Sequence, residues 1–78
     1  MITVMWEAVA DPDRIAEVVG WATGLAADGL AGTEVYVSAD SRVVVLAHWR
    51  DEDSVADLVA PAGTLRREPH AWRFTRVG

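Results

Sequence analysis

Apolar residues follow one another most closely between Arg42 and Trp49, in the run RVVVLAHW. Side chains alternate along a strand, so this run has two faces: Val43, Val45, Ala47 and Trp49 on one, and Val44, Leu46 and His48 on the other. Both faces are largely apolar. A chain of 78 residues rarely buries both faces of a strand alone. We therefore expect a helix layer on one face and a second copy of the chain on the other.

The N-terminal part of the chain predicts a strand followed by a helix. Ile2–Val9 is rich in β-branched and aromatic residues, with Glu7 as its only charge. Asp11 is expected to cap a helix that has Pro12 at its first position, and Gly29 is predicted to end it. The apolar positions between them have the spacing of a single helical stripe: Ile15, Val18, Val19, Ala22, Leu25 and Ala26.

The second half predicts a hairpin, a second helix and a last strand. Thr33–Ser38 and Arg42–Trp49 are separated by three residues, as in a hairpin. A second helix is expected to begin after a cap at Asp51 or Asp53, and the alternating Ala71–Val77 is predicted as the last strand. The residues that define the second helix are the apolar Val55, Leu58 and Val59 and the terminating Pro61 and Gly63.

The resulting order, β-α-β-β-α-β, is that of a ferredoxin-like α+β domain. Such a domain is a four-stranded antiparallel sheet with two helices on one face. Residues 1–78 form a single domain, since no linker, repeat or low-complexity segment interrupts them. A chain this short buries only about 60% of its unfolded surface, and it has no cysteine for a disulfide. Oligomerisation is the remaining common source of stability, so we expect a homodimer.

The composition of the chain disfavours several classes of binding partner. The net charge is −5, which disfavours nucleic acid, because binding to nucleic acid rests mainly on phosphate neutralisation. It equally disfavours an anionic membrane surface, and no apolar run reaches the roughly 18 residues of a membrane span. The N-terminus lacks the features of a signal peptide, so a cytoplasmic location is expected. With no cysteine and no His spacing typical of ligands, no metal site is predicted.

The stretch VVVLAHWRDEDSVADLVAP resembles the third strand and second helix of the antibiotic biosynthesis monooxygenase family. The positions that carry the resemblance are Trp49, Asp51, Ser54, Val55 and Pro61. It implies a dimeric α/β barrel and cofactor-free oxygenation of a small aromatic, polyketide-like compound. Haem-degrading members are a poorer match, since this chain has no Asn, and Leu58 and Arg67 stand where those members have a helix Trp and an axial His.

Several side chains have chemistry suited to such a reaction. His48 is the candidate catalytic base, because an imidazole titrates near neutrality. The alternative is that His48 is a satisfied core or interface histidine. The candidates for lining a pocket are Trp6, Glu7, Trp21, Tyr36, His70, Trp72 and Arg73. The tryptophans can stack on a flat ligand or simply fill the core and the dimer interface.

Two functions therefore remain open. The first is a cofactor-independent monooxygenase acting on a small aromatic substrate. The second is a non-catalytic dimeric module, either ligand-binding or structural. The first predicts a cavity of several hundred cubic ångström between helices and sheet, lined by His48 or Glu7.

Overall fold

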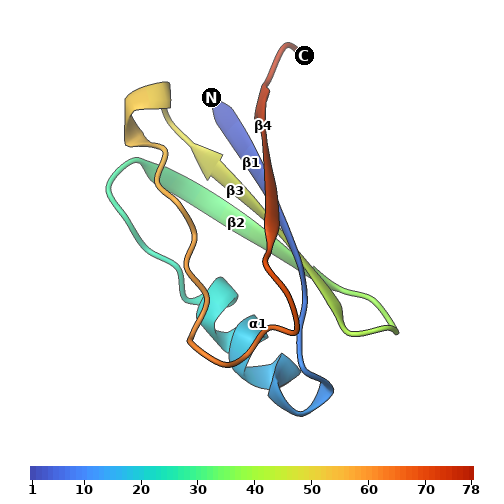
Figure 1. The fold of residues 1–78 in the computed structure, drawn as a ribbon. Coiled ribbons are helices and arrows are strands. Elements are labelled where there is room, and N and C mark those ends of the chain that lie inside the picture. Colours follow the sequence, from blue (N-terminus) through green and yellow to red (C-terminus); the bar gives the residue numbers. More distant parts are fainter.

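The computed structural model describes residues 1–78 and is built on one four-stranded antiparallel sheet (Figure 1). Strand β1 (Ile2–Val9) pairs with both β3 (Arg42–Trp49) and β4 (His70–Thr75), and β3 also pairs with β2 (Leu30–Val37). The strand order β2-β3-β1-β4 confirms the predicted α+β class and the four-stranded antiparallel sheet. The sheet is open in the single chain, with β2 and β4 at its two edges.

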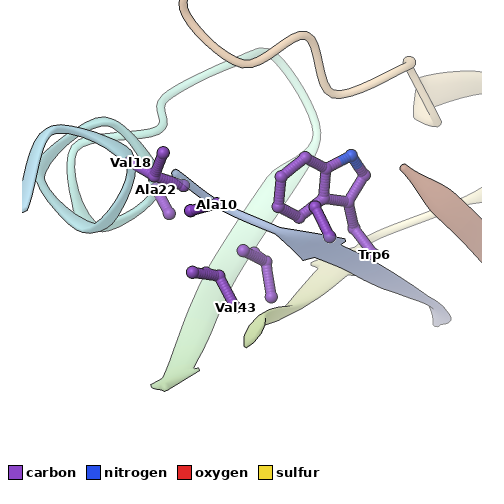
Figure 2. Packing of buried hydrophobic residues seen from close by; sticks show 7 residues of the cluster. Trp6, Ala10, Val18, Ala22 and Val43 are labelled. Atoms are coloured by element: carbon purple, nitrogen blue, oxygen red, sulfur yellow. The ribbon is translucent and has the colours of Figure 1, made fainter. Parts of the chain in front are cut away.

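The main core lies on one face of this sheet. The two-faced pattern of β3 is confirmed, since Val43, Val45 and Ala47 are fully buried while the residues between them are half-buried. Figure 2 shows the core side chains that β1, β3 and the helix contribute. The largest cluster comprises Trp6, Ala8, Ala10, Val18, Ala22, Val43 and Val45. A smaller one, further along the same face, comprises Val4, Ala47 and Trp49.

One α-helix covers part of this face. The short 3₁₀ turn η1 (Pro12–Arg14) leads into α1 (Ile15–Thr23), and the predicted cap is confirmed because the Asp11 carboxylate accepts a hydrogen bond from the Asp13 amide at 3.1 Å. The helix ends earlier than predicted, at Gly24, because glycine and threonine weaken its last turn. Its nine residues are far too few to cross a bilayer, and no other helix of the structure is long and apolar enough.

Gly29 does not cap the helix. It lies just before β2 with φ of +82°, a conformation that favours glycine. Its carbonyl accepts a hydrogen bond from the Arg50 amide at 2.8 Å, which ties the start of β2 to the end of β3. This pairing continues the ladder, so β2 begins at Leu30 rather than at the predicted Thr33, with an irregularity between Leu30 and Gly32.

The predicted second helix is wrong. Only the 3₁₀ turn η2 (Glu52–Ser54) forms, and Val55 is already extended, with φ of −61° and ψ of 125°. Asp51 caps this turn by accepting hydrogen bonds from the Ser54 amide and hydroxyl. Nine residues lie between this cap and Pro61, which is short for a stable helix, and valine and aspartate have weak helix propensity. The apolar spacing alone did not offset these costs, and Val59 points into solvent.

In place of that helix, residues 55–69 form an extended strap, here called the covering segment. In Figure 1 it runs in orange from η2 past α1 and turns back into β4. Leu58, Ala60 and Leu65 pack against the core, so the segment covers the same face as α1. Its far end is tied to β1, because Leu65 bridges to Ala10 and the buried Thr64 carbonyl accepts from the Asp11 amide at 2.9 Å.

Candidate functional site

A cavity of about 330 Å³ lies between the sheet and the covering segment. The β1 and β4 strands form one wall and the start of the covering segment forms the other. The lining is mostly apolar: Val4, Trp6, Val55, Ala56, Asp57, Leu58, Pro69, Ala71, Trp72 and Arg73. A helix over residues 52–60 would have presented a different surface to the sheet, so the cavity follows from the strap that replaces it. Its size falls in the range of small-molecule sites.

Trp6 forms the deepest part of this lining. Its side chain is 2% exposed, and its Nε1 hydrogen-bond donor is buried without an acceptor. Trp21 of α1 packs edge-on against it, with ring centroids 5.2 Å apart and an interplanar angle of 60°. In Figure 2 the indole nitrogen lies on the side of the ring away from Val18 and Ala22 of α1. Of these two predicted pocket residues, Trp6 lines the cavity. Trp21 does not line it and instead packs against the Trp6 ring.

Strand β4 adds one small and one charged residue to the wall that it forms with β1. Ala71 pairs with Trp6, and Arg73 pairs with Val4, so both side chains lie on the core face. The small Ala71 leaves room beside the indole ring. Arg73 and Asp57 are the charged residues of the lining, and the Arg73 guanidinium lies 4.0 Å from the Glu52 carboxylate. The site thus combines apolar walls with one cation and one anion at its edge.

His48 lies on the opposite face of the sheet, away from the cavity. Its Nε2 lies 2.6 Å from Glu34 Oε1, and its Nδ1 lies 2.9 Å from Thr3 Oγ1. Because a carboxylate only accepts, Nε2 carries a proton, and in the neutral ring the Thr3 hydroxyl donates to Nδ1. Neither ring nitrogen is left free to take a proton from a ligand, so the surroundings of His48 are those of a satisfied histidine.

Glu34 also accepts a hydrogen bond from the Tyr36 hydroxyl at 3.0 Å. The bonds from His48 and Tyr36 lower the pKa of Glu34, since both stabilise its charged form. The same bond to Glu34 raises the pKa of the Tyr36 hydroxyl. At neutral pH Glu34 is ionised and Tyr36 is protonated, so Tyr36 is a donor rather than a base.

Glu7 and His70 also lie outside the cavity. They pair with each other across β1 and β4 on the face that carries His48, and they border a smaller hollow of about 110 Å³. Arg42 makes an ion pair with Glu7 at 3.3 Å there. His70 stacks on Trp72, with ring centroids 6.0 Å apart. The structure therefore brings together Trp6 and Arg73 among the predicted pocket residues and separates them from Glu7, Tyr36, His48 and His70. Trp72 also borders the cavity, but it pairs with Met5 on the other face of the sheet.

Sequence reasoning missed most of the apolar lining, because it assigned residues 52–60 to a helix. Asp57 is the charged residue of the lining that it missed. Two signals were present in the chain: the weak helix formers Val55, Asp57 and Val59, and the small Ala71 between larger residues in β4. No three His, Asp or Glu side chains gather in a way that could hold a metal ion.

Comparison with protein-family models, with curated proteins and with solved structures finds no match to this chain.

Proposed function

We propose that the chain is a homodimeric binding protein that holds one small aromatic ligand in the cavity between the sheet and the covering segment. The observation that carries the proposal is the cavity itself, apolar on most sides and bordered by the indole of Trp6. An aromatic wall favours a flat ring, since rings gain from stacked and edge-to-face contacts beyond the area that they bury. Binding requires nothing of His48, whose ring nitrogens are both engaged.

The homodimer is supported by the uncovered face of the sheet. Its centre is apolar and half-buried or exposed, with Met5, Val44 and Leu46 flanked by Tyr36, Trp72 and Phe74. Its charges lie in pairs, Glu34 with His48 and Glu7 with Arg42. An apolar patch rimmed by polar groups is typical of a protein interface. Two such sheets packed face to face would complete the dimeric α/β barrel that the sequence resemblance implies.

Filling the cavity tests the binding function. Ala71→Leu places a larger side chain beside Trp6, so we expect it to weaken binding of 2-naphthol about tenfold or more in isothermal titration calorimetry. Ala39→Leu, an exposed change in the β2–β3 turn, is the matched control and should bind like the wild type. If the wild type binds no 2-naphthol, or if Ala71→Leu binds it equally well, the proposed site is wrong.

Asp57 favours a second candidate function, cofactor-free oxygenation. An apolar cavity with a carboxylate at its edge can hold a phenolic compound and take its proton. The resulting anion supplies the electrons that reduce O2, so that a CH2 group of an anthrone becomes a carbonyl with release of water. This is the activity that the resemblance to antibiotic biosynthesis monooxygenases implies, with the base in the cavity instead of at His48.

Oxygen uptake decides between binding and turnover. With an anthrone as substrate and no metal or flavin added, an oxygenase should consume O2 above the spontaneous rate. Asp57→Asn should then reduce the catalysed rate by about 100-fold, as removal of a general base does, while His48→Ala should retain it. If only His48→Ala lost activity, His48 and not Asp57 would be the base. If the wild type consumed O2 no faster than the spontaneous reaction, binding would remain as the function.

A further inference from the structure

The uncovered face of the sheet carries bulkier side chains at one edge than at the other. Its β4 edge has His70, Trp72 and Phe74, of which Trp72 and Phe74 are exposed. At the β2 edge, Gly32 lies in the same row across the sheet as Phe74, and Glu34 lies in the row of Trp72. A hollow of about 390 Å³ is bordered by Gly32 and Glu34. A partner that fits this face must therefore be bulky over β2 and slim over β4.

A second copy of the chain can meet this face in two symmetric ways, because a homodimer has a twofold axis. An axis parallel to the strands lays β4 of each copy over β2 of the other, so that bulky side chains meet small ones. An in-plane axis perpendicular to the strands lays β4 over β4 and β2 over β2. The bulky edges would then hold the β2 edges apart, and the two Glu34 carboxylates would face each other. Interfaces are packed as densely as protein interiors, and like charges across them are costly, so the parallel axis is favoured.

The polar groups of the two edges are also complementary under the parallel axis. The Glu34 carboxylate accepts from His48 and Tyr36 in the single chain, and an ionised carboxylate has about four acceptor sites. The exposed Trp72 carries an indole N–H that can only donate. Because Glu34 and Trp72 share one row of the sheet, the parallel axis places each of them opposite the partner's copy of the other. A hydrogen bond there would stabilise the Glu34 charge when dimerisation removes its water.

We propose that two copies of the chain pack about a twofold axis parallel to the strands, with β4 of each copy over β2 of the other. The partner's Phe74 fills the hollow at Gly32, and the partner's Trp72 donates its indole N–H to Glu34. The interface is thus built to select a second copy of this chain. This arrangement rests on the proposed homodimer and adds its symmetry and the contacts that specify the partner.

Cross-linking reports the arrangement directly, because the chain has no cysteine of its own. Packed sheets lie about 10 Å apart, so a short bismaleimide of about that reach joins cysteines that face each other. Tyr36 shares a row with His70. A mixture of Tyr36→Cys and His70→Cys chains should therefore give covalent dimers. A mixture of Tyr36→Cys and Gly32→Cys chains is the matched control: it should give none, since those positions face each other only under the perpendicular axis.

A double-mutant cycle tests the contact between Glu34 and the partner's Trp72. Trp72→Phe keeps a ring and removes the donor, so we expect the dimer Kd to rise about tenfold, as measured by sedimentation velocity. In the Glu34→Ala background the same change should alter Kd by about twofold or less. Trp21→Phe is the control, because it changes a tryptophan of α1 on the covered face and should leave Kd unchanged.

The outcomes separate this arrangement from the homodimer itself. Links in the Gly32→Cys mixture, links in neither mixture of a dimeric protein, or additive effects in the cycle would overturn the arrangement and leave the homodimer standing. A wild type that stays monomeric would overturn both.

Discussion

Gly29→Ala is expected to lower the free energy of unfolding by about 3 kcal/mol or more, the largest effect of any single methyl group added to this chain. The backbone has φ of +82° there, which costs a residue with a side chain about 1–2 kcal/mol. The new Cβ would also overlap the Ser54 side chain, so η2 would have to move. A chain of this size has roughly 4–12 kcal/mol in total, and thermal unfolding should show a Tm lower by roughly 15 °C.

Two further variants separate the backbone cost from the steric one. Gly63→Ala has φ of +76° with open space around the new Cβ, so it should show the backbone cost alone. Ser54→Gly removes the atoms that the Gly29→Ala methyl would meet, so the double variant should lose less stability than the sum of the two single changes. Strict additivity would show that no contact between Gly29 and Ser54 limits this position.

Leu46→Arg is expected to convert the proposed homodimer into a folded monomer. Leu46 lies at the centre of the uncovered sheet face and pairs with Met5 of β1 and Glu34 of β2. A guanidinium there would have to lose its hydration on dimerisation, and central interface residues contribute about 2 kcal/mol or more. The dimer Kd should therefore rise about thirtyfold or more, which sedimentation velocity at micromolar concentration would show as half the wild-type mass.

The single chain should tolerate this change, because the arginine would face solvent in the monomer. Circular dichroism should then show an unchanged fold. Val59→Arg is the matched control: Val59 is 79% exposed on the covering segment, on the far side of the sheet, and this variant should remain dimeric. A wild type that sediments as a monomer, or a dimeric Leu46→Arg, would show that this face is not the interface.

Much of the sheet could be predicted from the sequence, because its signals are local. The alternation in Arg42–Trp49 is confirmed by the burial of every second residue, and the Asp11 cap lies where its spacing to Pro12 indicates. The second helix failed for a reason that is also physical. Apolar spacing at Val55, Leu58 and Val59 favours a helix against the sheet, yet the segment before Pro61 is short and its valines and Asp57 have weak helix propensity.

The cavity could be predicted only in part, since it depends on how the chain packs rather than on any motif. Trp6 and Arg73 were identified by residue type, and the register of β4 against β1 brings them to one face. The same alternation of faces places His48 and Glu7 on the other side, a separation that needs the strand register to be known. The position of Asp57 in the cavity lining could not be predicted, because it depends on the extended conformation of residues 55–69.

The part of the covering segment from Ala56 to Gly63 makes hardly any use of its own backbone. No amide there donates a hydrogen bond to another backbone group, and side chains such as Leu58 hold this part against the core. Its sequence is thus under few of the constraints that a helix or strand imposes. This stretch could therefore change in sequence and even in length, by evolution or by engineering, while the sheet and α1 stay as they are. The chain thereby places one wall of the proposed binding site on a segment whose backbone is only lightly constrained.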